Sequence, residues 1–153
     1  MEKFIRILVL NGPNLGYIGL RQQEIYGRDG LDRLPGMVEM VMGGAMSGLR
    51  LEFDQNNSEG GLMDRLEKAK LDKIDGIVFN AGAYTHTSLA LADCLAWISI
   101  PTVEVHLSNI LARTEPIRHT SLLAKNVLGV IAGFGLLGYA LAVRAIFEHL
   151  KAK

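Results

Sequence analysis

The stretch 101–119 concentrates side chains that could act on an anion. Residues 101–105 are rich in β-branched side chains and predict a short strand. A histidine, a serine, an asparagine and two arginines follow it, namely His106, Ser108, Asn109, Arg113 and Arg118. In open α/β sheets, ligands bind beyond the carboxyl ends of parallel strands, so this is where chemistry on an anion is expected. A polar surface loop with two solvated arginines is the alternative that this stretch alone leaves open.

Two other predicted strands also end in polar side chains. Residues 4–10 and 75–79 are apolar runs, and each is followed by asparagines or a histidine. The long loop after the first run adds an arginine and a tyrosine. The residues concerned are Asn11, Asn14, Arg21, Tyr26, Asn80 and His86. If the strands are neighbours, these groups converge, and so many donors suit a small, oxygen-rich, anionic substrate.

One pair of residues argues for catalysis and against mere binding. Glu104 lies two residues before His106, so in a strand the two side chains point to the same face. A carboxylate that orients an imidazole suits proton transfer. Tyr26 follows Arg21 by five residues, and a nearby positive charge favours the phenolate form of a tyrosine, which could then serve as a base. The rival interpretation is a flavodoxin-like module that binds a small polyhydroxylated carboxylate without converting it.

The order of predicted elements indicates an α/β fold. Strands and helices alternate with short connections, which is typical of a doubly wound parallel sheet. Five strands fit the flavodoxin-like order 2-1-3-4-5, with helices on both faces. Strands are expected at 4–10, 49–55, 75–79, 101–105 and 127–132, and helices at 31–48, 59–71, 87–98 and 135–151, with a helical turn at 122–126.

Composition narrows the class of protein. The 153 residues suffice for one domain, 1–153, with a sizeable core. Sixteen basic and sixteen acidic side chains cancel, so no nucleic-acid partner is expected. The single Cys94 cannot form an internal disulfide and is interpreted as a buried side chain. Residues 1–10 contain no signal-peptide or membrane-anchor pattern, which predicts a cytoplasmic protein without a membrane partner.

A glycine motif near the C-terminus has the spacing of a dinucleotide-binding fingerprint. Gly133, Gly135 and Gly138 match the spacing of that fingerprint and open a predicted helix. The fingerprint also needs a following strand and an acidic residue about 20 positions on, and the chain ends at Lys153. The glycines are therefore interpreted as serving a tight turn and close helix packing, and a nucleotide-binding regulator is disfavoured. No His/Cys metal-ligand spacing is present, and no metal is expected.

Several motifs together closely resemble type II 3-dehydroquinate dehydratase. They begin with Asn-Gly-Pro-Asn-Leu-Gly at 11–16 and with Arg21 followed by Tyr26-Gly27. They continue with Asn-Ala-Gly-Ala-Tyr-Thr-His-Thr-Ser at 80–88, Glu-Val-His-Leu-Ser-Asn at 104–109 and Ala-Gly-Phe-Gly-Leu-Leu-Gly-Tyr at 132–139. The motifs stand in the order and spacing of the family, from the first strand to the last helix.

The resemblance implies a flavodoxin-like fold and a hydro-lyase that needs no metal or organic cofactor. The family converts 3-dehydroquinate to 3-dehydroshikimate by anti elimination through an enolate, in aromatic biosynthesis or in quinate breakdown. Its members assemble as dodecamers built from four trimers.

The resemblance also implies a role for each matching residue. Tyr26 would remove the C2 proton, Arg21 would favour its phenolate, and Asn14 would help hold a water at the enolate oxygen. His106 would protonate the leaving hydroxyl, oriented by Glu104. Substrate would be bound by Asn80, His86 and Arg118 at its hydroxyls, by Leu107 and Ser108 at its carboxylate, by Arg113 near a lid, and by Asp93 of a neighbouring subunit.

Some positions depart from the family pattern. Gln22 and Gln23 stand where an acidic residue and a proline are common, and Leu122 stands where a tyrosine is common. Thr114 resembles a one-residue insertion, which affects the register of Arg118. None of these departures removes a predicted catalytic residue, so activity is expected.

Overall fold

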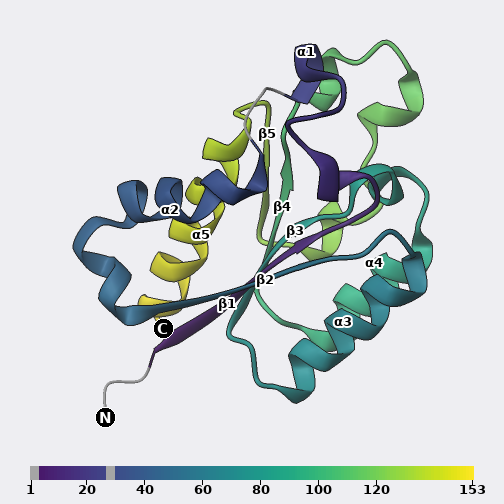
Figure 1. The fold of residues 1–153 in the computed structure, drawn as a ribbon. Coiled ribbons are helices and arrows are strands. Elements are labelled where there is room, and N and C mark those ends of the chain that lie inside the picture. The colour runs from purple at the N-terminus through teal and green to yellow at the C-terminus, as the bar shows by residue number, and fades with distance from the viewer. Residues whose placement is uncertain (1–3, 27–29) are drawn as a thin grey trace.

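The computed structural model describes residues 4–26 and 30–153, without the side chains of residues 25 and 26. Its centre is a parallel five-stranded sheet with the order β2-β1-β3-β4-β5 (Figure 1). The strands are β1 (Ile5–Asn11), β2 (Leu49–Gln55), β3 (Gly76–Asn80), β4 (Thr102–His106) and β5 (Gly129–Ala132). The predicted flavodoxin-like topology is confirmed.

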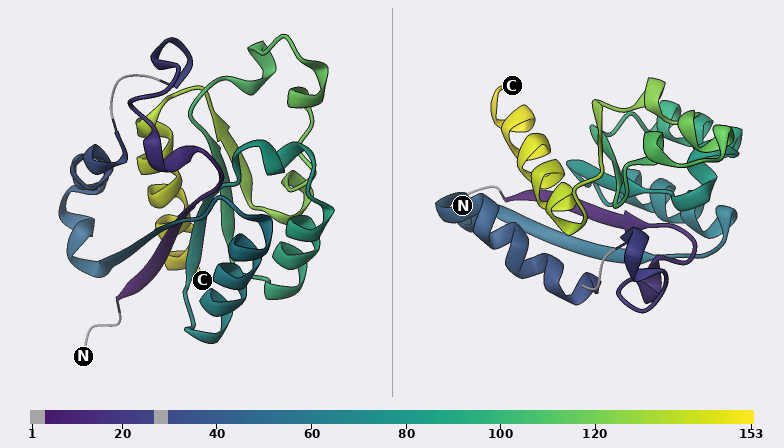
Figure 2. Two further views of the ribbon diagram at one scale, coloured as in Figure 1. Left: turned by 45° about the vertical axis from the view of Figure 1, so that its right-hand side comes forward. Right: turned by 90° about the horizontal axis from the view of Figure 1, so that it is seen from above.

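Helices cover both faces of this sheet. Helices α2 and α5 pack on one face and α3 and α4 on the other, as the view from above shows (Figure 2). The helices are α1 (Gln23–Tyr26), α2 (Leu34–Met42), α3 (Glu59–Leu71), α4 (Leu89–Ile98) and α5 (Leu136–Lys151). Short 3-10 helices span Leu15–Tyr17, Leu31–Arg33, Gly43–Gly48, Gly82–His86, Ile110–Ala112, Pro116–His119 and Ala124–Asn126. No helix in the described ranges has the length and apolarity needed to cross a membrane.

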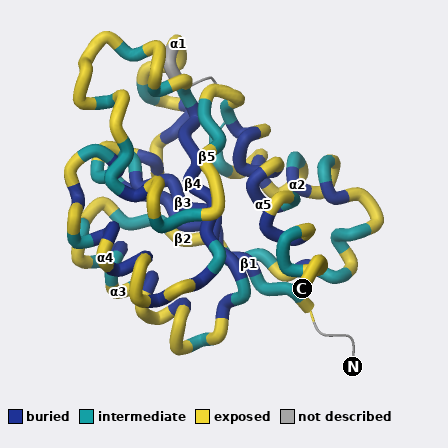
Figure 3. The backbone as a smooth tube through the Cα atoms, turned by 180° about the vertical axis from the view of Figure 1, so that it is seen from behind, coloured by how far each residue is buried: buried dark blue, intermediate teal, exposed yellow. Residues whose placement is uncertain are grey.

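Strand β1 runs through the middle of the molecule and divides its core in two. Because side chains alternate along a strand, Ile7 and Val9 face the core under α2 and α5, while Leu8 and Leu10 face the core under α3 and α4. All four are fully buried, and the buried segments converge on the sheet (Figure 3). A strand covered on both faces reads as a continuous apolar run, which is how the sequence predicted it.

The helix expected at 31–48 is shorter than predicted. Only Leu34–Met42 is α-helical, and 3-10 segments flank it on both sides. The helix ends at Gly43, whose φ of 52° lies in the left-handed region that glycine tolerates. One face of this helix is apolar, and its Leu34, Val38 and Met42 are buried in the core on that side of the sheet.

The predicted start of α3 is confirmed. Ser58 is its N-cap, and its Oγ accepts a hydrogen bond of 3.0 Å from the backbone N–H of Gly61. A capping serine satisfies one of the amides that have no partner within the helix.

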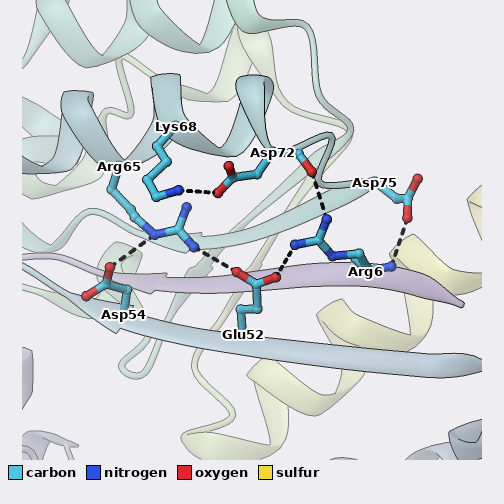
Figure 4. A network of polar contacts seen from close by, with 7 residues as sticks. All are labelled: Arg6, Glu52, Asp54, Arg65, Lys68, Asp72 and Asp75. Carbon is cyan, nitrogen blue, oxygen red and sulfur yellow. Dashed lines mark hydrogen bonds and ion pairs between the residues drawn. The ribbon is translucent and has the colours of Figure 1, made fainter.

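A network of charged side chains ties the edge strand β2 to its neighbours (Figure 4). Glu52 on β2 accepts from Arg6 on β1 at 2.6 Å and from Arg65 on α3 at 3.1 Å, and Arg65 also donates to Asp54 at 3.0 Å. Arg6 and Glu52 are both more than a third exposed, so each such pair stabilises by about 0–1 kcal/mol. We interpret the network as securing the orientation of β2 and α3.

The polar residues that end three strands belong to the strands themselves. Asn11, Asn80 and His106 are the last residues of β1, β3 and β4, one position beyond the predicted strand ends. Asn11 and Asn80 are register partners, so their side chains start from adjacent positions at one edge of the sheet. The sheet thus places these predicted site residues at the carboxyl ends of its strands.

Candidate active site

A pocket of about 120 Å³ opens at the carboxyl ends of β1, β3 and β4. It brings together three segments that are far apart in sequence: the loop after β1, the turn after β3 and the segment after β4. Figure 1 shows α1 and the segment after β4 beyond the same end of the sheet. Of the predicted site residues, those that line the pocket are Asn14, Arg21, Asn80, His86, His106, Leu107, Ser108, Arg113 and Arg118.

His106 and Glu104 form a buried pair at the base of this pocket. The distance from His106 Nε2 to Glu104 Oε1 is 2.6 Å, and the residues are 5% and 1% exposed. A carboxylate oxygen can only accept, so Nε2 carries the proton of this hydrogen bond. Nδ1 is then the ring nitrogen that remains to exchange a proton with a ligand. The geometry expected from their spacing in the strand is therefore present.

His86 stands beside His106 in the pocket. The two rings are stacked, with centroids 6.3 Å apart and an interplanar angle of 17°. His86 Nδ1 lies 2.7 Å from the backbone oxygen of Thr120, so Nδ1 donates there. In the neutral ring, Nε2 is left as an acceptor, which suits a ligand hydroxyl.

The loop after β1 holds Asn14 in an unusual backbone conformation. Its φ of 66° is left-handed, a region that asparagine visits more readily than most residues. Its backbone N–H donates to Asn57 Oδ1 at 3.1 Å, and its carbonyl accepts from Arg21 Nη1 at 3.4 Å. Arg21 is thereby placed at the pocket beside Asn14. Tyr26 ends α1, and its side chain lies outside the described residues.

Two arginines of the segment after β4 share one carboxylate. Glu115 lies 3.4 Å from Arg118 Nε and 3.9 Å from Arg113 Nε. A hydrogen bond within Glu115 itself, followed by the charges of Arg118 and Arg113, holds the pKa of its carboxyl below the usual value. Glu115 is exposed, so an anionic ligand entering the pocket could replace it as the partner of these arginines.

Glycines let two of the site segments approach closely. A Cβ added to Gly12 would lie 2.6 Å from the backbone oxygen of Ala81, and the N–H of Gly12 donates to the carbonyl of Asn80 at 2.7 Å. At the other side, Gly133 and Gly135 donate to the carbonyls of His106 and Leu107 at 3.3 and 3.0 Å. Gly133 has a φ of 97°, which requires glycine. The interpretation of this glycine motif as a turn is confirmed, because its N–H groups hold the end of β4.

Over residues 5–147 the sequence matches the family described as dehydroquinase class II. The chain belongs to the class II dehydroquinase family. The 3-dehydroquinate dehydratase of Dinoroseobacter shibae is 49% identical over 148 residues, which are 97% of this chain and 96% of that protein. The Clostridium perfringens (strain 13) protein of the same name is 43% identical over 149 residues, 97% and 100% of the two chains.

Comparison with solved structures leads to the same family. The type II dehydroquinase of Butyrivibrio crossotus superposes with a TM-score of 0.87 at 39% identity, over 94% of this chain and 98% of the other. A 3-dehydroquinate dehydratase-like protein of Bifidobacterium longum superposes with a TM-score of 0.65 at 29% identity, over 98% and 100%. The resemblance noted in the sequence is confirmed for the family and for the fold.

Sequence reasoning missed Ser121, which completes the buried pair. Its Oγ accepts from the backbone N–H groups of Leu123 and Ala124 at 3.1 and 3.0 Å, so its own proton is directed to Glu104 Oε2 at 2.8 Å. Glu104 is thus held from both oxygens, by His106 and by Ser121. No local pattern marked this serine, because it lies 17 residues from its partner in an irregular segment.

Ser121→Ala is expected to lower kcat about tenfold in this dehydroquinase. The change frees one oxygen of a buried carboxylate, whose lost hydrogen bond is worth about 1.5–3 kcal/mol, and so loosens the orientation of His106. Steady-state kinetics would measure the effect. Ser47→Ala is the matched control, since Ser47 donates only to Gly44 in an exposed turn. An unchanged kcat in Ser121→Ala would show that Glu104 needs no second partner.

Asp93 and Cys94, which were also singled out from the sequence, lie on α4 away from the pocket lining. Asp93 is exposed on α4, so the pocket of this chain does not include it. Cys94 is 2% exposed, and burial raises the pKa of its thiol to about 11, which agrees with a structural role. In the described ranges, no three His, Cys, Asp or Glu side chains gather in a way that could hold a metal ion.

Proposed function

We propose that this class II dehydroquinase dehydrates 3-dehydroquinate to 3-dehydroshikimate by anti elimination through an enolate. The buried His106–Glu104 pair at the base of an arginine-lined pocket carries the proposal. Proton transfer needs such an oriented imidazole, and an anionic substrate needs the arginines. The relatives from Dinoroseobacter shibae and Clostridium perfringens bear the name of this activity.

In the first step, Tyr26 as phenolate removes the proton from C2 of the substrate. Arg21, which lines the pocket, provides the positive charge that favours the phenolate. Negative charge then develops on the carbonyl oxygen as the enolate forms. Asn14 helps to hold a water at that oxygen, and a donor placed there stabilises the charge.

In the second step, the enolate expels the hydroxyl group at C1 as water. His106 protonates the departing oxygen, and Glu104 orients the ring and stabilises its positive charge. The geometry of the pair supports these roles. Glu104 is hydrogen-bonded to Nε2 of His106, so Nδ1 is left to exchange a proton with the substrate. Neither step requires a metal or an organic cofactor.

The remaining pocket residues bind and orient the substrate. Leu107 and Ser108 follow β4 and hold the carboxylate through backbone amides and the serine hydroxyl. Asn80, His86 and Arg118 bind the ring hydroxyls, and Arg113 belongs to the lid over the site. All of these residues line the pocket.

The proposed assembly is a dodecamer of four trimers in which Asp93 reaches the site of a neighbouring subunit. An exposed stripe on α4 supports it: Leu89, Asp93 and Trp97 are spaced by four residues and share one helix face. Leu89 and Trp97 are 67% and 54% exposed, and such apolar exposure beside a functional carboxylate suits a subunit contact. The proposal places this assembly in the cytoplasm.

Activity should fall on dilution if the assembly completes the site. Light scattering and turnover measured together over a dilution series would test this. Loss of specific activity in step with loss of mass is expected. Fully active monomers at micromolar concentration would contradict the contribution of Asp93.

The proposed reaction is tested by the ultraviolet absorbance of purified protein with 3-dehydroquinate and a chelator. The product contains a conjugated enone acid, so absorbance should rise at an unchanged rate when the chelator is present. Detectable binding without any rise would instead favour a flavodoxin-like module that binds a polyhydroxylated carboxylate.

A further inference from the structure

A buried polar cluster lies at the carboxyl ends of β1 and β3, and the reaction outlined above gives a role to only one of its members. Tyr139 on α5 is fully buried, and its hydroxyl lies 2.6 Å from Asn11 Oδ1 and 2.8 Å from Asn80 Nδ2. Both asparagines are 3% exposed. Of the three residues, only Asn80 also lines the pocket.

The hydrogen bonds of this cluster can point in only one direction. The backbone N–H of Gly82 donates to the Asn80 side chain at 3.0 Å, so the acceptor atom there is the carbonyl oxygen Oδ1. The amide nitrogen Nδ2 must therefore face Tyr139 and donate to its oxygen. The hydroxyl has a single proton, which is then directed to Asn11 Oδ1. The backbone N–H of Gly82 can only donate, and it thus sets the direction of every hydrogen bond in this cluster.

This series of hydrogen bonds fixes which group the Asn80 side chain presents to a ligand. Its carbonyl oxygen is engaged by Gly82 and one N–H by Tyr139, which leaves the second N–H of the same amide for an oxygen in the pocket. A free amide could rotate and offer either a donor or an acceptor. Gly82 sets which end of the Asn80 amide faces Tyr139, and Tyr139 holds that end in place, so Asn80 presents only a donor to the pocket.

We propose that Tyr139 is a positioning residue that locks the side-chain amide of Asn80 as a hydrogen-bond donor to a substrate oxygen. The inference rests on the proposed function, in which Asn80 binds a ring hydroxyl, and adds the residue that sets its orientation. A substrate group that accepts a hydrogen bond at this point is bound, and one that can only donate is disfavoured.

The chemistry of the tyrosine fits a static role. Burial raises the pKa of Tyr139 above its ordinary value, and the hydrogen bond from Asn80 offsets this only in part. The hydroxyl therefore keeps its proton at neutral pH. Tyr139 acts through Asn80 and exchanges no proton with substrate.

Tyr139→Phe removes only the hydroxyl and tests the proposal. It leaves Asn11 Oδ1 and Asn80 Nδ2 without their partner in a buried place, and the Asn80 amide keeps the hydrogen bond from Gly82 but loses the one to Tyr139. Because Asn80 binds substrate in the ground state and the transition state alike, KM should rise about tenfold while kcat stays within about threefold. Tyr84→Phe is the matched control, since its hydroxyl donates to the backbone of Asn57 outside the pocket lining. Its KM should not change.

A double-mutant cycle separates positioning from a general loss of stability. If Tyr139 acts through Asn80, adding Tyr139→Phe to Asn80→Ala should lower kcat/KM by less than about twofold further. Equal losses in both backgrounds would overturn the proposal. Val143→Ala on α5 creates a cavity at a fully buried position and reports how destabilisation alone affects KM. A rise in its KM equal to that of Tyr139→Phe would also overturn it.

A second variant covers the case in which Tyr139→Phe fails to fold. Asn11→Ala removes the acceptor of the tyrosine proton but keeps the ring packed, so the proton can compete for the Asn80 side chain. KM should rise, as expected for Tyr139→Phe, and an unchanged KM would contradict the proposed role of the hydrogen bonds that link Asn11, Tyr139 and Asn80. If the wild-type protein shows no turnover, the proposed function fails separately. Calorimetry of 3-dehydroquinate binding then tests the role of Tyr139. The proposal expects Tyr139→Phe to bind 3-dehydroquinate more weakly than the wild-type protein, and equal binding would refute it.

Discussion

Replacement of Tyr26 by phenylalanine is expected to lower kcat by about 10³-fold or more, while the Kd for 3-dehydroquinate changes by less than about threefold. The change removes the proposed base and little else. Arg21 lines the pocket beside Asn14 and so brings a positive charge to the pocket, which favours the proposed phenolate. The arginines and the backbone amides that are proposed to bind the substrate are untouched, so binding should survive.

Stopped-flow or steady-state absorbance measures the loss of turnover, and calorimetry measures binding. Tyr17→Phe is the matched control, because Tyr17 belongs to the same loop and is 73% exposed. It should keep full activity. Unchanged turnover in Tyr26→Phe would remove the tyrosine from the mechanism and direct attention to His86 as the proton acceptor.

The sheet and most of the site could be predicted from the sequence because their signals are local. Residues 7–10 of strand β1 are a continuous apolar run, and Ser58 is a cap next to the helix that it begins. Glu104 and His106 are two residues apart in one strand, so the strand repeat alone sets their common face. Convergence of three strand ends follows from the strand order, which the alternation of elements implies.

The residues that position the site could not be predicted in this way. Tyr139 and Asn11 are 128 residues apart, and only the packing of α5 on the sheet brings them into contact. Ser121 lies in a segment without a periodic pattern. The closeness of Gly12 to Ala81 is a property of two backbones, whereas Asn-Gly-Pro in a sequence indicates only a turn. Most side chains that line the pocket were thus visible in the sequence, whereas Ser121 and Tyr139, which contact Glu104 and Asn80 from distant segments, were not.

Glu104→Gln is the second substitution with a large expected effect, because a glutamine cannot replace Glu104 without disturbing one of its two partners. The Ser121 hydroxyl must donate, since its oxygen already accepts from two backbone N–H groups. His106 Nε2 also donates in its present form. A glutamine offers one oxygen and one NH₂ group, so either Ser121 meets a donor or His106 has to move its proton from Nε2 to Nδ1. The neutral amide also loses the charge that stabilises the imidazolium during proton transfer.

We expect kcat of Glu104→Gln to fall by about 10²–10³-fold, the range of a general acid–base contribution. Glu39→Gln, at an exposed position on α2, is the matched control and should be fully active. Because Glu104 works through His106, adding Glu104→Gln to His106→Ala should cost little more, as residues that act as a unit are not additive. If the two losses multiplied, Glu104 would contribute to catalysis independently of the imidazole, and its place behind His106 would need a different explanation.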